Sequence, residues 1–349
     1  MVLIIGAGLS GLLIAYRLKE LAVPYRIIEA RNRIGGRIFT QTTVGGTPLE
    51  MGATWFGSQH PQLLSLIEEL NLTTFLQYNG DFYHFYDPGS VHSANYPLPQ
   101  QVPSYRLAGG TSQLINKLAD LLDKDSIFLN QEVKEITVQD DQIKVITAGG
   151  QTFQGDKAVL ALPPKLWSSN IDFVPSLPVP LHGVGGNTQT WMEDSTKAAV
   201  EYAEPYWRRS NRASMIVSNQ GPFVECYDHT NESGTKYALC GFLNPAMNYL
   251  SVTQRKEMVM NQLYDVFGAE SKNYLSYNEY LWANDPFTQK ASESPLFGHQ
   301  NNGHPLFKKS YFNNKIFFSG SETSTHSPGY MEGAVSAAME AFERIKKSW

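Results

Sequence analysis

The chain opens on a short apolar run, Val2 to Ile5, that ends at a glycine. Apolar side chains then recur at the three- and four-residue spacing of an amphipathic helix, at Leu9, Leu12, Leu13 and Tyr16. A second strand-like run follows over 25–29. This order predicts a β-α-β unit at the start of the chain. We do not interpret the apolar start as a signal peptide, because no basic region precedes it and three glycines interrupt it.

The same patterns continue along the chain. They predict helices over 61–70, 111–122 and 331–347 and strands over 132–138, 143–147, 157–162 and 315–319. Two stretches interrupt them: residues 78–105 are rich in aromatics and prolines, and 171–186 hold three prolines and three glycines. We expect both stretches to be crossings between two domains. The prediction is one domain of 1–77, 106–180 and 285–349 interleaved with another of 78–105 and 181–284.

A glycine motif lies between the first strand and the first helix. Gly6, Gly8 and Gly11 have the spacing that allows a tight turn, close approach of a pyrophosphate, and close packing of helix on sheet. Glu29 ends the second strand, where a carboxylate accepts hydrogen bonds from ribose hydroxyls and repels a 2′-phosphate. The motif alone could be a glycine-rich turn without a ligand. Together with the strand, helix and acid, it indicates a dinucleotide, and FAD or NAD fits better than NADP.

Charge and composition argue against binding to nucleic acid, membranes or metal ions. A net charge of −5 gives no broad basic surface for nucleic acid. Without an apolar run of 18 or more residues, we expect no membrane partner and, by default, a cytoplasmic address. Cys226 and Cys240 lie in no CxxC pattern, and His299 and His304 have the pattern of surface imidazoles, so no metal is expected. Nothing in the sequence indicates the oligomeric state.

Residues 29–37 resemble the segment after the glycine turn in the flavin-containing amine oxidase family, which includes the monoamine oxidases. In this segment Ala30, Arg31, Gly36 and Arg37 are candidate FAD-binding residues. Gly36 would let the backbone pass close to the cofactor, and the Arg37 guanidinium would donate to the pyrophosphate. Arg31 could instead be a solvated surface charge.

Residues 318–334 resemble the second flavin-binding segment of the same family. The resemblance implies that Gly320 and Glu322 contact the cofactor, with Glu322 bonding its hydroxyls, and that the backbone at Met331 meets the flavin pyrimidine edge. A helix beginning there would stabilise negative charge on reduced flavin through its N-terminus. The implied fold is α/β, with a Rossmann-like FAD-binding domain interleaved with a smaller substrate domain of mixed sheet and helix.

Further matches lie between the two ends. Residues 50–55 resemble the family's loop beside the isoalloxazine ring, which makes Gly52, Ala53 and Thr54 candidate cofactor contacts. Val133 falls where the family's backbone touches adenine, and Trp282 matches a tryptophan-containing loop that continues through 285–288.

Two residues are candidates for catalysis. Residues 196–202 and 205–208 resemble the segment that carries the family's active-site lysine, so Lys197 would hold a water at flavin N5. Tyr330 matches one wall of the family's aromatic cage, where a π-face can guide an amine. The alternatives are a solvated edge lysine and a tyrosine that bridges core and solvent.

The chain departs from the family at the second wall of the cage. Ser292 stands where an aromatic is common, Ala291 where monoamine oxidases attach flavin to cysteine, and Lys290 where glycine is frequent. FAD is therefore expected to be non-covalent. The segment between Asn79 and Tyr105 is also short, so we expect a more open pocket that Phe82, Tyr83 and Phe85 could line.

The resemblance implies an enzyme that oxidises a small amine. Hydride would pass from the amine α-carbon to flavin N5, the imine would hydrolyse, and molecular oxygen would reoxidise the flavin to give hydrogen peroxide. One alternative is a flavin desaturase or cyclic-amine oxidase that shares the terminal motifs. Another is a flavin-binding partner protein without turnover, which Lys290 and Ser292 would explain.

Overall fold

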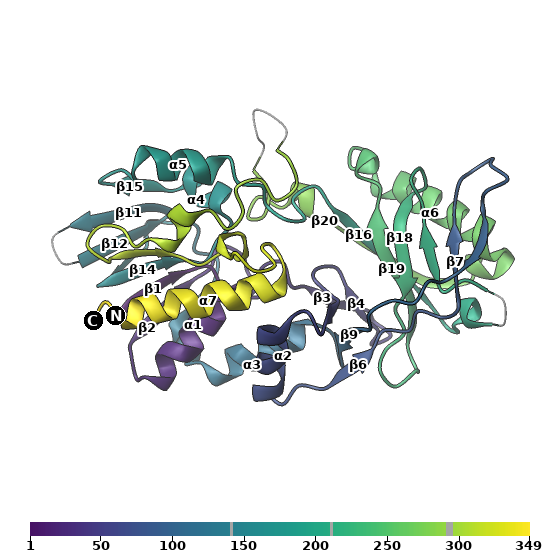
Figure 1. Ribbon diagram of the computed structural model, residues 1–349, viewed down its shortest axis with the longest axis horizontal. Coiled ribbons are helices and arrows are strands. Elements are labelled where there is room, and N and C mark those ends of the chain that lie inside the picture. Colours follow the sequence, from purple (N-terminus) through teal and green to yellow (C-terminus); the bar gives the residue numbers. More distant parts are fainter. Residues whose placement is uncertain (140–141, 210–211, 291–295) are drawn as a thin grey trace.

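The computed structural model describes residues 1–139, 142–209, 212–290 and 296–349. Two lobes lie side by side along the long axis of the molecule (Figure 1). The first lobe contains both chain termini. Short strands between the lobes connect the two.

A five-stranded parallel sheet forms the centre of the first lobe, in the order β10-β2-β1-β14-β21. Its strands are β1 (Val2–Ile5), β2 (Tyr25–Ile28), β10 (Ile127–Phe128), β14 (Lys157–Leu160) and β21 (Ile316–Phe318). All four residues of β1 are buried, as expected for a parallel strand covered on both faces. The helix α1 (Leu9–Glu20) connects β1 to β2, which confirms the predicted β-α-β unit.

Different layers cover the two faces of this sheet. Apolar side chains of one face pack against α1, α2 (Pro61–Glu69), α3 (Ser112–Leu121) and α7 (Met331–Lys346). The other face packs on a sheet of order β13-β12-β11-β15. Its strands are β11 (Val133–Gln139), β12 (Gln142–Thr147), β13 (Thr152–Gly155) and β15 (Asp172–Val174). The predicted α/β class is confirmed.

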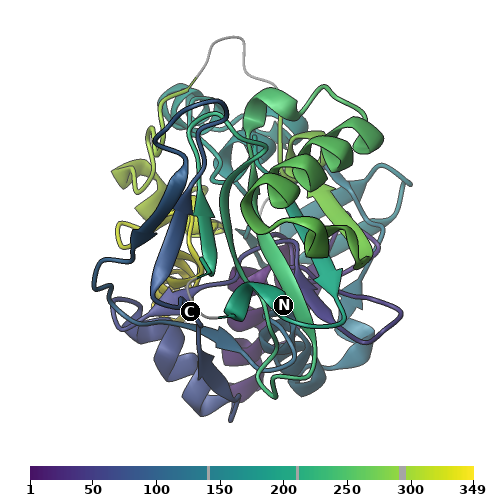
Figure 2. The same cartoon turned by 90° about the vertical axis from the view of Figure 1, so that its right-hand side faces the viewer.

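The second lobe is a seven-stranded sheet with α6 (Val252–Phe267) packed on one face (Figure 2). In sheet order its strands are β20 (Tyr274–Leu281), β16 (Thr196–Tyr202), β19 (Tyr237–Leu243), β18 (Phe223–Asp228), β17 (Met215–Val217), β7 (Phe82–Phe85) and β8 (Ala94–Pro97). The aromatic segment 78–105 thus contributes the hairpin at one edge of this sheet. The division into domains stays a prediction.

Short strands and a small apolar core join the lobes. The strands are β3 (Thr40–Thr42), β4 (Pro48–Glu50), β5 (Phe56–Gly57), β6 (Thr74–Leu76) and β9 (Ser104–Leu107). Leu49 and Met51, at β4, pack against Ala199 of β16 and Ala238 and Cys240 of β19. This core fixes the loop after β4 against the central strands of the second lobe.

No helix among the described residues is both long and apolar enough to cross a membrane. In the same part of the chain, no three His, Cys, Asp or Glu side chains are grouped so that they could hold a metal ion. Cys226 and Cys240 are buried free thiols. A cytoplasmic address stays a prediction.

Residues 171–186, which we expected to be a crossing between domains, contain regular structure. These residues form β15 and a helix, α5 (Val179–Gly186), that packs on α4 (Pro164–Asn170). Proline is compatible with α5 because it lies at the first helical turn, where its missing N–H has no helical partner. Gly185 allows close packing, since a Cβ there would lie 2.5 Å from the Trp167 ring. The predicted domain boundary at 180/181 falls inside this helix.

We expect Gly185→Ala to lower the free energy of unfolding by about 1–3 kcal/mol, because the added methyl would collide with Trp167. Gly183→Ala is the matched control in the same helix, where a Cβ would meet open space. It should be neutral or stabilising by up to ~1 kcal/mol. Chemical denaturation of both variants measures the difference, and equal effects would contradict the packing argument.

Candidate active site

One cavity of about 520 Å³ extends from the parallel sheet of the first lobe to β16 of the second. Its volume lies within the range of roughly 300–1,000 Å³ typical of small-molecule and cofactor sites. The first lobe contributes Gly6, Gly8 and Glu29 to its lining, and the second contributes Lys197 and Phe242. The predicted nucleotide motif and the predicted catalytic lysine therefore share one cavity.

The three motif glycines have different roles in the turn. Gly6 has φ +104°, and a Cβ there would lie 2.8 Å from the Ala161 carbonyl oxygen. A Cβ on Gly11 would collide with the carbonyl oxygen of Gly6, so this glycine serves helix packing. A Cβ on Gly8 would meet nothing within 4 Å, and Gly8 lines the cavity. The space beside Gly8, at the N-terminus of α1, fits a phosphate group held by backbone N–H groups.

Glu29 holds the turn and faces the cavity. Its carboxylate accepts from the backbone N–H of Ala7 at 2.7 Å and from that of Arg31 at 2.8 Å. The residue is buried, yet it lines the cavity. Because each carboxylate oxygen accepts two hydrogen bonds, both oxygens retain a position for a ribose hydroxyl.

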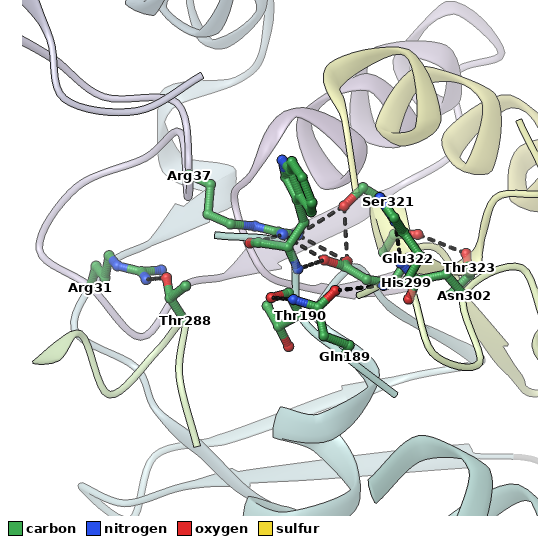
Figure 3. A network of polar contacts seen from close by, with 12 residues as sticks. Arg31, Arg37, Gln189, Thr190, Thr288, His299, Asn302, Ser321, Glu322 and Thr323 are labelled. Carbon is green, nitrogen blue, oxygen red and sulfur yellow. Dashed lines mark hydrogen bonds and ion pairs between the residues drawn. The ribbon is translucent and has the colours of Figure 1, made fainter. Parts of the chain in front are cut away.

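Arg31 is not a solvated surface charge. It donates to Asp285 Oδ1 at 2.7 Å and to Thr288 Oγ1 at 2.8 Å (Figure 3). Its guanidinium lies 5.6 Å from the centre of the Phe287 ring. Burial raises the pKa of Asp285, but the charge of Arg31 and the hydrogen bonds from Tyr280 and Arg31 outweigh this and lower it. Arg31, Phe287 and Thr288 together form one wall of the cavity.

Arg37 and Glu322 form an ion pair at the cavity wall (Figure 3). Arg37 Nη2 donates to Glu322 Oε2 at 2.9 Å and to the Ser321 hydroxyl at 2.8 Å. Glu322 is fully buried and, unlike Arg37 and Ser321, does not line the cavity. Burial raises the pKa of Glu322, but the positive charge of Arg37 outweighs it, so the pKa lies below its ordinary value. This placement favours a role for Glu322 through Arg37 over a direct bond to the cofactor.

The same ion pair holds the main chain of Trp191. The Trp191 N–H donates to Glu322 Oε1 at 3.2 Å, and its carbonyl oxygen accepts from Arg37 Nη1 at 3.0 Å. Trp191 and Met192 line the cavity just before β16 begins. Neither residue was predicted, because nothing in the local sequence marks them.

Lys197 is fully buried in β16, between β19 and β20. Its Nζ donates to the Gly52 carbonyl oxygen at 2.7 Å and to the Thr54 hydroxyl. The ring centres of Trp55 and Phe242 lie 4.6 and 5.3 Å from Nζ. Burial lowers the pKa of Lys197, and the negative charge of Glu50 opposes this. Such an environment is typical of catalytic groups.

Glu50 lies beside this lysine at the junction of the lobes and is also buried. It accepts from the Thr40 hydroxyl at 3.1 Å and from the backbone N–H of Thr111. Burial raises the pKa of Glu50, while the hydrogen bond from Thr111 and the charge of Lys197 act in the opposite direction. The two groups thus stabilise each other's charged forms in a site of low polarity.

Tyr330 is the N-cap of α7 and is 41% exposed, with its ring at the cavity. Its ring centre lies 5.1 Å from that of Trp191 and 6.1 Å from that of His299. Met331, which begins α7, also lines the cavity. The N-terminus of α7 is therefore directed at the cavity, as the predicted stabilisation of negative charge requires.

The structure brings most of the predicted site residues into this cavity. They are Gly6, Gly8, Glu29, Arg31, Gly36, Arg37, Gly52, Ala53, Thr54, Lys197, Gly320, Tyr330 and Met331. The cavity lining does not include Gly11, Ala30, Val133, Trp282 or Glu322. Trp282 instead donates from Nε1 to the Met51 carbonyl oxygen at 2.7 Å and so supports the loop 51–54. The roles of all these residues stay predictions.

The structure describes one of the three residues that depart from the family pattern. Lys290 is exposed and is not among the cavity-lining residues. Ala291 and Ser292 lie outside the described residues. The prediction that Phe82, Tyr83 and Phe85 line the pocket is wrong, because they form β7 near the far edge of the seven-stranded sheet.

Comparison with known proteins agrees with this geometry. The model of the family described as "Flavin containing amine oxidoreductase" matches residues 9–105 and 82–346. This chain belongs to that family. It is accordingly a flavin-dependent oxidoreductase, and FAD is its cofactor. Neither of its two cysteines lines the cavity, in agreement with non-covalent binding.

Individual relatives match over nearly the whole chain. A probable flavin-containing monoamine oxidase A of Dictyostelium discoideum is 22% identical, over 99% of this chain and 97% of its own length. Amine oxidase B of Sus scrofa is 22% identical over 99% of this chain and 85% of its own.

Solved structures share the fold. Putrescine oxidase bound to putrescine has a TM-score of 0.84 at 21% identity, covering 99% of this chain and 98% of the other. Cyclohexylamine oxidase from Brevibacterium oxydans has a TM-score of 0.84 at 18% identity, with the same coverage.

Filling the space beside Gly8 should displace the cofactor. We expect Gly8→Val to reduce the flavin bound per protein by about tenfold or more, equivalent to ~1.4 kcal/mol of binding, while the protein stays folded. Gly149→Val is the control, because a Cβ there also meets open space but lies outside the cavity. Flavin absorbance relative to protein absorbance measures the effect. Normal flavin content in Gly8→Val would contradict the prediction that a phosphate group of the cofactor lies beside Gly8.

Removing Arg37 should leave a buried carboxylate without its partner. We expect Arg37→Met to lower the free energy of unfolding of the flavin-free protein by about 3–5 kcal/mol. Arg209→Met, which breaks an exposed pair with Glu270, should have a much smaller effect, because water screens exposed pairs.

The stability difference should also depend on pH. Because the folded pKa of Glu322 is lowered, its stabilising contribution is complete above its unfolded pKa of about 4.3 and is lost as pH falls through the lower folded value. The gap between wild type and Arg37→Met should therefore narrow in acid. A gap below ~1 kcal/mol at neutral pH would show that the pair does not stabilise the fold.

Proposed function

We propose that this enzyme oxidises a small amine, with molecular oxygen as the electron acceptor. One observation carries the proposal: a buried lysine of lowered pKa lies in the same cavity as a glycine turn and a carboxylate suited to a dinucleotide. The membership of the family supports an amine as the substrate class. When bound, FAD supplies the acceptor for a hydride from the amine α-carbon and passes the electrons to oxygen, which yields hydrogen peroxide.

Lys197 is the residue that would place a water near the reacting carbon. Gly52 and Thr54 accept two of the three N–H donors of its ammonium group. A third donor is left to hold a water in the cavity, which Lys197 lines. Such a water would be positioned to hydrolyse the imine that follows oxidation.

The walls around Lys197 would favour the neutral form of the amine. Trp55 and Phe242 line the cavity, and their rings lie 4.6 and 5.3 Å from Lys197 Nζ. Moving a charged ammonium from water to the surroundings of Lys197 is unfavourable, so the amine would lose its proton before it reaches this lysine. The neutral amine has the free lone pair that the loss of a hydride requires.

Similar proteins suggest which amines to test. Their names refer to monoamines, putrescine and cyclohexylamine. A panel of these amines should be mixed anaerobically with the purified flavoprotein while the visible absorbance of the flavin is followed. Loss of that absorbance, followed by peroxide release when oxygen is admitted, is the expected result. A flavin that dithionite reduces but no amine does would overturn the proposal.

We expect Lys197→Met to slow reduction of the flavin by amine, or its reoxidation, by about 10²–10⁴-fold, because the positioned water is lost. Lys157→Met is the matched control, since Lys157 is also a buried lysine in a strand but does not line the cavity. It should leave both rates within about twofold. Rapid-mixing absorbance measures them. Indifference to Lys197→Met would favour a desaturase-like reaction instead.

A further inference from the structure

We propose that Trp191 and Tyr330 form one continuous aromatic wall that receives the amine, with Trp191 holding the Tyr330 ring in place. Both residues line the cavity. The inference rests on the proposed function, because it assigns the recognition of the amine to these side chains. It makes Trp191 a positioning residue for Tyr330.

The ring geometry excludes a ligand between the two aromatics. Their centres lie 5.1 Å apart, with 37° between the ring planes. A ligand between two parallel rings needs roughly 7 Å, since each layer of atoms is separated by about 3.5 Å. Trp191 and Tyr330 are therefore in contact with each other, and both line the cavity.

Both backbone polar groups of Trp191 are hydrogen-bonded. Its N–H and carbonyl oxygen bond to Glu322 and Arg37, at 3.2 and 3.0 Å. Gly329 packs directly against the Trp191 side chain, where a Cβ would lie 2.6 Å from that of Trp191. The indole therefore has a fixed position next to the residue that precedes Tyr330.

His299 supports the wall from the outside. Its ring lies 4.8 Å from that of Trp191, at an interplanar angle of 14°. Its backbone N–H donates to Gln189 Oε1 at 3.1 Å, and its Nδ1 lies 3.2 Å from Asn302 Nδ2 (Figure 3). Within the described part of the chain, Trp191 and His299 are the aromatic rings that contact Tyr330.

The contact with Trp191 restricts the orientation of the Tyr330 ring. Tyr330 is 41% exposed, so without a neighbouring ring its side chain would be free to turn toward solvent. Aromatic faces attract cations most strongly when they are desolvated. By covering one side of Tyr330, Trp191 fixes the direction of its ring and leaves the other side for the amine.

The test uses a cation that cannot react. Phenyltrimethylammonium has no nitrogen lone pair, so it cannot lose a hydride to form an iminium ion, and its binding to the flavoprotein can be followed through the flavin absorbance. We expect Trp191→Ala to raise its Kd by about three- to thirtyfold, while the flavin content is unchanged because the main-chain bonds of residue 191 remain. Trp191→Phe should recover most of the affinity.

Two further variants complete the experiment. His299→Ala should raise the Kd by a smaller factor than Trp191→Ala, because His299 contacts the wall from outside. Trp349→Ala, which removes an exposed tryptophan outside the cavity, should change nothing. With any amine that reduces the flavin, Trp191→Ala should raise KM more than it lowers kcat.

The outcomes separate this inference from the proposed function. An unchanged Kd in Trp191→Ala, a wild-type protein that does not bind the cation, or a loss of flavin in parallel with the loss of affinity would each overturn the aromatic wall. A protein that binds the cation at this wall but is reduced by no amine would overturn the proposed reaction and leave the binding surface standing.

Discussion

The site depends on the buried ion pair between Arg37 and Glu322. It joins positions 285 residues apart, one after the N-terminal β-α-β unit and one before the C-terminal helix. A buried carboxylate is tolerated because Arg37 neutralises it, so the two terminal segments must meet for either charge to be stable. The pair also fixes the main chain of Trp191, which leads directly into β16. One interaction thereby aligns the cofactor segments with the strand that carries Lys197.

The cavity that Arg37 lines is polar at one end and apolar at the other. Backbone N–H groups of the glycine turn and the carboxylate of Glu29 suit the phosphates and ribose of a dinucleotide. At the far end, Lys197 lies among aromatic rings, and Glu50 is the buried carboxylate that partly compensates its charge. The small core around Met51 and Cys240 holds both groups at the junction of the lobes. One cavity thus joins a part suited to a dinucleotide to a buried part around Lys197.

The sequence predicts those parts of the site that lie within one short segment of the chain. Gly6, Gly8 and Glu29 follow from spacing within one β-α-β unit, whereas Lys197 and Tyr330 needed a family resemblance, since one lysine or tyrosine has no distinctive pattern. Trp191 and the pairing of Arg31 with Asp285 were missed because both depend on packing between distant segments. The Asp-Pro-Phe-Thr sequence at 285–288 did contain a signal: Asp285 accepts from the Phe287 N–H, as in an Asx turn. In α5 the prolines and glycines do not mark a loop, because proline at the first turn is compatible with a helix and Gly185 allows close packing against Trp167.

The central claim is that one cavity orients FAD with its adenosine at Glu29 and its reactive ring toward Lys197. An experimental structure of the FAD-loaded protein tests it most directly. The account predicts ribose hydroxyls on the Glu29 carboxylate, the pyrophosphate beside Gly8 and Arg37, and the isoalloxazine ring between the loop 51–54 and Lys197. A flavin ring found away from Lys197, or an adenosine that does not contact Glu29, would contradict it.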